Sequence, residues 1–345
     1  MTTKSITREL TSNTYLVRYS VGATQNGLRL DHFLMEHYRR RSREAMKRAI
    51  ESGAITINRG QSPHLHLGKL KPSTQLLDGD EVLVLSERRP EPPVNFDYRL
   101  IYEDEVLFVI EKPANLPVHP SGRFFFNTLL IHLKTQGHTN PVLNAEELYF
   151  LAHRIDKETS GILVLAKNSE ACAHIVAQFA ARKTEKAYFA IVKGHTPEKF
   201  EVSEPLARSR RSKIGLKMEC TTLEEGGATA HTAFERLEIA GDFSLVKCYP
   251  KTGRQHQIRV HLEKAGHPIV GDKLYGVDEE FALLFYERER LTPEAEAKLL
   301  IPRHALHSCH LSFTHPTTGK KMAFDCALPA DLQAFFDAQK TKPLT

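Results

Sequence analysis

The chain has 345 residues, of which 41% are hydrophobic and 26% charged, and a net charge of +5 at pH 7. This is an ordinary soluble composition, long enough for one large domain and a smaller one. No apolar run approaches the roughly 20 residues that span a bilayer. The polar N-terminus lacks the apolar core of a signal peptide, so we expect a cytoplasmic protein.

The first 26 residues are predicted to form a polar leader with one strand at 14–19. The unit over 27–87 begins with helical spacing of Leu28, Leu30, Phe33 and Leu34. Ser42 can cap a second helix that runs to residue 52, where Gly53 stops it. Alternation then predicts a strand at 54–58, and another follows at 80–85.

Basic residues gather around the start of the second helix. Arg43 and Lys47 lie one turn apart and share a face. Most charge runs are solvated helix surfaces, but clustered cations also bind a polyanion by displacing its counterions. The stretch RRRSREAMKRAIESGAITIN resembles the α-L RNA-binding motif first described in a small-subunit ribosomal protein, although a longer connection at 61–74 departs from that pattern. The resemblance implies RNA contacts by Arg40, Arg41, Arg43, Lys47 and Arg48.

A Pro-rich, charged stretch at 88–97 predicts a linker. Two strands around a turn are expected within 99–112, followed by an irregular segment to residue 120. Residues 98–330 are expected to form the second domain, and 331–345 a C-terminal tail. Within the second domain, 278–300 are predicted to be a variable insertion without chemistry of its own.

Residues 151–168, LAHRIDKETSGILVLAKN, are predicted as strand, turn and strand. A short extended piece at 151–155 precedes polar turn residues, and 162–166 is an unbroken apolar run. Asp156 therefore lies where a buried strand opens into a loop, a position where a rigid element can hold a carboxylate in a cleft. Taken alone, such an Asp is usually a turn former.

Further elements follow in order. Ser169 can cap a helix to residue 182, and strands are expected at 186–192, 228–237 and 242–249. Thr252 and Gln255 are expected to form a capping box at the start of a helix that carries Arg259 and ends at residue 264. The last strands, 304–313 and 321–327, flank a hairpin turn.

The five cysteines are scattered without Cys-x-x-Cys spacing, which predicts neither a disulfide framework nor a zinc site. The densest group of potential metal ligands is His307, Cys309 and His310. On a strand, His307 and Cys309 share a face while His310 points away. The sequence therefore predicts no metal site.

Three motifs together resemble the RluA-type pseudouridine synthases. They are the segment from His153 to Gly161, HRIDKETSG; the K-x-Y-x-A-x-V-x-G pattern around Tyr188; and TGRQHQIRVHLEKAGHPIVGDKLYG around Arg259. The resemblance covers about residues 27–327. It implies an α+β fold, with a large mixed, mostly antiparallel sheet, flanking helices and the small RNA-binding domain. It also implies ribosomal RNA or tRNA as partner, no cofactor, and a monomer.

In that family the corresponding Asp is the catalytic carboxylate, the Arg forms an ion pair with it, and the Tyr ring packs against the target base. The resemblance therefore implies catalytic roles for Asp156, Arg259 and Tyr188. It places the substrate site at His153, Arg154, Thr159, Ser160 and Ile258.

Two other functions stay open at this point. A non-catalytic RNA-binding or ribosome-assembly protein with this fold would be expected to have a broken catalytic set, whereas Asp156, Tyr188 and Arg259 are all present. A glycoside hydrolase would need a second carboxylate beside the scissile bond, and Glu158 lies on a turn with no motif behind it.

Overall fold

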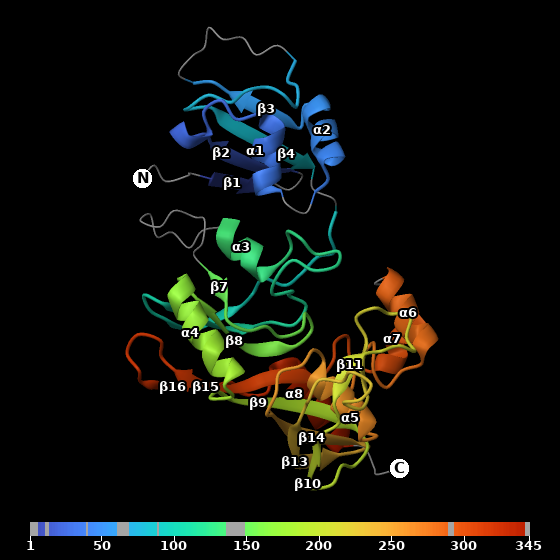
Figure 1. The fold of residues 1–345 in the computed structure, drawn as a ribbon. Helices are drawn as coiled ribbons and strands as arrows, with labels where there is room; N and C mark the ends of the chain where they lie inside the picture. Colours follow the sequence, from blue (N-terminus) through green and yellow to red (C-terminus); the bar gives the residue numbers. More distant parts are fainter. Residues whose placement is uncertain are drawn as a thin grey trace. The chain divides into compact units, whose positions relative to one another are not determined.

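The computed structural model describes residues 6–10, 14–38, 41–60, 69–87, 90–135, 149–288 and 293–341. The chain divides into two compact units, one of residues 1–92 with 132–147 and one of 93–131 with 148–345 (Figure 1). The expected domain bounds, 27–87 and 98–330, stay predictions. Among the described residues, no helix has both the length and the apolar character to cross a membrane.

The described part of the smaller unit contains a four-stranded antiparallel sheet in the order β1-β2-β4-β3, and the helices α1 and α2 pack on it. The strand expected at 14–19 is confirmed as β2, which pairs with β4 along its length, so the expected leader contributes strands to this sheet. Both helices turn apolar side chains into the core, among them Phe33 and Met46. The elements are β1 (Ile6–Leu10), β2 (Thr14–Ser20), α1 (Leu30–His37), α2 (Arg43–Glu51), β3 (Ile55–Asn58) and β4 (Glu81–Glu87).

The limits of α2 follow from its sequence. Ser42 is the N-cap, and its hydroxyl accepts a hydrogen bond from the Ala45 amide at 3.2 Å. Gly53, which follows the helix, has a φ of +79°, a left-handed conformation that costs glycine little. The predicted start and stop are confirmed.

The larger unit is built on a ten-stranded, mostly antiparallel sheet, which confirms the α+β prediction. The order is β10-β13-β14-β9-β15-β8-β6-β5, with β16 beside β15 and β7 beside β8. Its strands are β5 (Arg99–Glu103), β6 (Leu107–Lys112), β7 (Phe150–Leu151), β8 (Ser160–Ala166), β9 (Glu185–Lys193), β10 (Lys199–Val202), β13 (Thr232–Ala240), β14 (Phe243–Pro250), β15 (Leu306–Thr314) and β16 (Lys321–Asp325); β11 (Leu206–Arg208) and β12 (Met218–Cys220) form a separate pair.

One junction in the large sheet is parallel. Strand β15 runs beside β8 with His307 opposite Ser160 and Ser308 opposite Gly161. Gly161 has a φ of +109°, and a Cβ atom there would stand 2.2 Å from the Ser308 carbonyl oxygen. The junction therefore requires glycine, which lets the two backbones approach. We call it the parallel seam, and it joins β5, β6 and β8 to β15, β9, β14, β13 and β10.

Helices cover parts of this sheet (Figure 1). Helix α4 (Ser169–Ala180) packs against β8 and β15, and α8 (Ala330–Lys340) packs against β13 and β14. The expected C-terminal tail therefore begins as a helix, because Leu332 and Phe336 bury one of its faces in the core. The cap of α4 is Asn168, not Ser169, since the Asn168 side chain accepts from the Ala171 amide at 2.8 Å. The other helices are α3 (Leu129–Thr135), α5 (Gln257–Lys264), α6 (Glu279–Arg288) and α7 (Pro293–Leu299).

Candidate active site

Asp156 lies on the loop that leads from β7 into β8. The strand expected at 151–155 is shorter than predicted, because β7 ends at Leu151. The carboxylate faces a cavity of about 120 Å³ and also lines a wider one of about 580 Å³. Since the Asp156 side chain is 23% exposed, it is accessible from the cleft.

Arg259 on α5 reaches this carboxylate from a distant part of the sequence. Its Nη1 donates to Asp156 Oδ2 at 2.9 Å. Its Nε and Nη2 both donate to Asp272, at 2.6 and 2.8 Å. The Tyr275 ring lies 4.9 Å from the guanidinium carbon. The guanidinium is therefore fixed by Asp272 and Tyr275, with one edge left for Asp156.

The charges at the site keep Asp156 ionised. Burial acts to raise the pKa of Asp156, but His256 where it is protonated, and Arg259 through its charge and its hydrogen bond, outweigh burial and hold this pKa below its ordinary value. Near pH 7, where His256 is neutral, the acting charge is that of Arg259. The pKa of Asp272 is lowered in the same way, with burial opposed by Arg259. One guanidinium thus compensates two carboxylates in a largely buried setting.

His256 is a site residue that the sequence analysis did not single out. It has a left-handed backbone, with φ of +55°, immediately before α5. Its Nδ1 is 2.8 Å from the Tyr275 hydroxyl, and its Nε2 is 4.0 Å from Asp156 Oδ2. Burial lowers the pKa of His256 to about 4, so the ring is neutral near pH 7. Both His256 and Asp272 lie within the third motif, the segment around Arg259. Their place in that motif was the feature of the sequence that could have indicated a role at the site.

The capping box predicted for Thr252 and Gln255 at the start of α5 is wrong. The acceptor is Gln257, whose Oε1 takes hydrogen bonds from the Thr252 hydroxyl at 2.7 Å and the Arg254 amide at 3.0 Å. Gln255 instead reaches the Leu216 carbonyl at 3.5 Å. With the left-handed turn at His256, the N-cap is His256 and not Thr252, so the helix starts four residues later than the capping box requires.

The structure brings most of the predicted site residues to the narrow cavity. Its lining includes the predicted residues His153, Arg154, Asp156, Thr159, Tyr188, Ile258 and Arg259. Burial raises the pKa of Tyr188 to about 12, so its hydroxyl stays protonated. Ser160 is the exception, because it does not line the cavity and its hydroxyl instead contacts His307 Nδ1 at 2.9 Å.

The other polar residues of the loop have distinct surroundings. His153 is turned inward, and its Nε2 accepts from the Val164 amide at 3.0 Å. Thr159 Oγ1 is 2.7 Å from His304 Nε2. Arg154 is exposed, with Nη1 3.2 Å from His119 Nε2. Of the three, Arg154 is therefore the one free to meet a large ligand.

A buried lysine forms hydrogen bonds with the backbone of the loop that carries Asp156. Lys112, at the end of β6, is fully buried and donates to the carbonyls of Pro113, Leu116 and Lys157 at 2.8, 3.0 and 3.1 Å. Residue 157 follows Asp156 directly. The ammonium group therefore ties the irregular segment after β6 to the loop that carries Asp156.

Helix α6 contributes to the wider cavity through Phe285 and Tyr286. The Arg123 guanidinium, on the opposite segment, donates to the Tyr286 carbonyl at 3.3 Å. Part of the predicted insertion at 278–300, for which the sequence predicts no chemistry, thus lines the cleft through α6.

In the smaller unit, the basic residues of α2 are on its solvent side. Arg41, Arg43, Lys47 and Arg48 are exposed, while Arg40 lies outside the described residues. Lys47 and Arg48 form loose pairs with Glu51 and Glu44, each at 3.9 Å. Exposed pairs at this distance bind weakly, so these cations can exchange their partners for phosphates.

Comparison with known proteins identifies the family. Residues 106–264 match the family described as RNA pseudouridylate synthase. Ribosomal large subunit pseudouridine synthase D of Zymomonas mobilis is 35% identical over 321 residues, covering 90% of this chain and 93% of that protein. The mitochondrial tRNA pseudouridine(32) synthase of Saccharomyces cerevisiae is 38% identical over 251 residues, covering 72% of this chain and 50% of that protein.

A solved structure agrees with this similarity. The human protein described as RNA pseudouridylate synthase domain containing 4 matches with a TM-score of 0.54 and 26% identity, covering 72% of this chain and 95% of that one. The small N-terminal sheet is consistent with an α-L-type domain. The chain therefore belongs to the RluA-type RNA pseudouridine synthases, which are isomerases.

Proposed function

We propose that this enzyme converts specific uridines of structured RNA to pseudouridine, with Asp156 as the catalytic carboxylate. The RNA is ribosomal RNA, tRNA or both. The observation that carries the proposal is the 2.9 Å contact between Arg259 and an Asp156 carboxylate accessible from a cleft. The similar proteins named above act on large-subunit ribosomal RNA and on tRNA, so both substrates are included. The cytoplasmic location and monomeric state stay predictions.

The reaction breaks the bond between the anomeric carbon of the ribose and N1 of uracil, and joins that carbon to C5 of the rotated base. The hydrogen at C5 leaves as a proton, and N1 gains one, so atoms and electrons balance without a redox partner. The step needs a group that stabilises or traps an electron-poor sugar or base, and an ionised carboxylate serves either purpose.

Each side chain then has a defined part. Asp156 acts as a nucleophile toward the sugar or the base, or as a base at the sugar. Arg259 keeps Asp156 ionised and oriented, because a buried carboxylate without a cation would take up a proton. Tyr188 packs its ring against the uracil and, with its proton retained, can deliver that proton late in the reaction.

The target base has to leave its stack before it reaches Asp156. Extruding a base costs a few kcal/mol, which stacking and hydrogen bonds in the pocket offset. The wider cavity, about 580 Å³, is within the range of small-ligand sites and meets the narrow one at Asp156. The exposed Arg154 occupies the space vacated in the RNA or binds a neighbouring phosphate.

The smaller unit supplies affinity in this proposal. Arg41, Arg43, Lys47 and Arg48, together with Arg40, bind RNA phosphates through charge, which is tolerant of sequence and sensitive to salt.

Asp156→Asn tests the assignment. The variant keeps the size of the side chain but removes its charge, so product formation should fall below detection while RNA affinity stays within a few-fold. Release of tritium from RNA labelled at C5 of uridine measures the chemistry. Asp337→Asn, on the exposed face of α8, is the matched control and should turn over normally. Normal turnover by Asp156→Asn would contradict the proposal.

The substrate is found separately. Carbodiimide-based mapping of pseudouridine in RNA from a strain that lacks the gene should show the loss of specific sites in ribosomal RNA, tRNA or both. Unchanged maps in both RNA classes would contradict the proposed substrates.

A further inference from the structure

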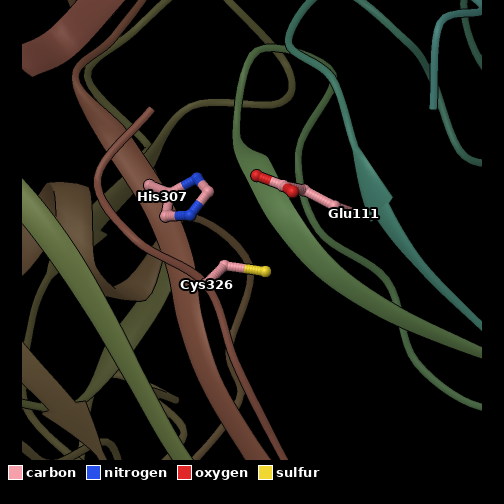
Figure 2. A group of neighbouring side chains, drawn as sticks. All are labelled: Glu111, His307 and Cys326. Carbon is pink, nitrogen blue, oxygen red and sulfur yellow. The ribbon is translucent and has the colours of Figure 1, made fainter. Parts of the chain in front are cut away.

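A second group of reactive side chains is distinct from the residues that line the catalytic cleft. Glu111 lies on β6, His307 on β15 and Cys326 just after β16. One ligand atom from each lies within 4.8 Å of the other two. Figure 2 shows the Glu111 carboxylate pointing toward the His307 ring, with the Cys326 side chain beside both. None of the three lines the narrow or the wide cavity at Asp156.

The imidazole of His307 is the most informative member. The residue is completely buried, and its Nδ1 contacts the Ser160 hydroxyl at 2.9 Å. Its Nε2 is also buried and makes no hydrogen bond of ordinary geometry within the described part of the chain, although the Ala327 backbone lies near the ring. Buried polar atoms are almost always satisfied, because an unsatisfied one loses its hydration without compensation. An unpaired nitrogen next to a carboxylate and a thiol indicates a missing ligand.

The other two side chains are held in place. Both Arg99 nitrogens that contact Glu111 bind the same oxygen, Oε2, at 2.9 and 2.6 Å, and the Cys326 thiol also interacts with this carboxylate. The Cys326 amide donates to the Cys309 carbonyl at 2.8 Å, which fixes the backbone of Cys326 against β15. Glu111 is 23% exposed, so a solute can approach the group from its side.

We propose that Glu111, His307 and Cys326 bind one divalent cation of the zinc class. A thiolate, an imidazole nitrogen and a carboxylate form a donor set that suits zinc, with a fourth position left for water. Ligand atoms of a tetrahedral zinc site lie roughly 3.5 Å apart, so the group contracts by about 1 Å on binding. The Cys326 thiol loses its proton to solvent as the metal–sulfur bond forms.

The surrounding contacts match what a metal site requires. A histidine ligand is usually oriented through its second nitrogen, and here that nitrogen meets the hydroxyl of Ser160, across the parallel seam. The carboxylate is held in turn by Arg99. Bound metal would link β6, β15 and the segment after β16 and should therefore stabilise this part of the sheet.

Cobalt(II) tests the site on the full-length protein, after stripping with a chelator and dialysis. Wild-type protein should take up one cobalt per chain and show a thiolate-to-cobalt charge-transfer band, which zinc abolishes by competition. Cys326→Ser should lose the band. Cys172→Ser, which removes a half-buried thiol elsewhere, should keep it. Absence of the band in the wild type, or its persistence in Cys326→Ser, overturns the proposal.

Glu111→Gln provides a second variant that preserves side-chain size at a partly exposed position. Its affinity for zinc, measured by competition with a chromogenic chelator, should fall at least 10-fold. The thermal midpoint of the wild type should rise with added zinc, and that of Glu111→Gln should rise less at the same concentrations. Equal zinc affinity in Glu111→Gln and the wild type overturns the three-ligand site. Circular dichroism without metal verifies that each variant is folded.

Discussion

Arg259 and Asp272 form a buried, two-point ion pair in which both carboxylate oxygens accept from the guanidinium, at 2.6 and 2.8 Å. Asp272 also accepts from the amides of Leu274 and Tyr275, at 2.9 and 3.1 Å. The carboxylate is therefore saturated by fixed donors. Because Arg259 is held this rigidly, the remaining Nη1 has a defined direction, and that direction is toward Asp156.

Replacing Arg259 should change the pH dependence of the reaction. In the wild type the pKa of Asp156 is below its ordinary value, so its protonation does not limit the rate near neutral pH. In Arg259→Met, burial is opposed by less positive charge and the pKa of Asp156 rises. The rate should fall by orders of magnitude and recover partly as pH increases. Single-turnover rates between about pH 5 and 9 measure this; a variant profile parallel to that of the wild type contradicts it.

Asp272→Asn should slow the chemistry without altering RNA binding. The Asp272 side chain is not exposed, so it cannot touch the substrate. The amide loses one of the two charged contacts, and a displaced guanidinium should lower kcat about 10- to 100-fold with little change in KM. Asp272→Glu retains the charge at a shifted position, so its kcat should lie between those of the wild type and Asp272→Asn. A rise in KM with normal kcat would argue against a positioning role.

Lys112→Met should destabilise the protein and disturb the loop that carries Asp156. The substitution leaves three carbonyls without their donor, which costs about 1–3 kcal/mol or more in the free energy of unfolding. Urea denaturation measures the loss. The exposed Lys183→Met is the control and should stay within about 0.5 kcal/mol of the wild type. Equal stability of Lys112→Met and the wild type contradicts the prediction.

The same variant gives a prediction on pH. Burial lowers the pKa of Lys112 from 10.5 to about 7. Between these values the unfolded chain binds more protons than the folded one, so wild-type stability gains from this residue as pH rises. Lys112→Met lacks that gain. The difference in unfolding free energy between wild type and variant should therefore widen from pH 7 upward, which urea titrations at several pH values can follow.

Removing two cations from α2 should weaken RNA binding through charge alone. For Arg43→Ala with Lys47→Ala, the slope of log affinity against log salt should become shallower by about 1–2, since each lost phosphate contact contributes about 0.7–0.9. The rate at saturating RNA should not change. Lys320→Ala, an exposed residue of the large unit, is the control. An unchanged slope in the double variant would remove α2 from the RNA interface.

Local patterns were sufficient to predict several elements. Ser42 and Gly53 mark the ends of α2 because cap and stop act within a few residues. The left-handed turn at His256 could not be inferred in this way, because it depends on Tyr275 and on the approach of Asp156. The error at Gln255 has the same origin. Gln255 could cap a helix in isolation, but in the folded protein it contacts the Leu216 carbonyl instead.

The candidate site shows a similar division. The resemblance of three motifs named Asp156, Tyr188 and Arg259, and the structure gathers them around one cavity. Periodicity and spacing did not reveal the bidentate partner Asp272 or the orientation of Ser160, which is directed to His307. The contact of Ser160 with His307 joins two strands far apart in the chain, and the register of β8 against β15 sets it. The contact of Arg259 with Asp272 joins α5 to the irregular segment that follows it, where periodicity gives no signal.

The parallel seam makes activity depend on the formation of both halves of the large sheet. Asp156 precedes β8, on one side of the seam, whereas Arg259 follows β14, on the other. Neither half of the sheet contains both charges, so a chain that stalls with one half unformed has no ionised, oriented carboxylate. Such a folding intermediate would have no activity on uridine. Two fragments divided between these halves should regain turnover only when they reassemble.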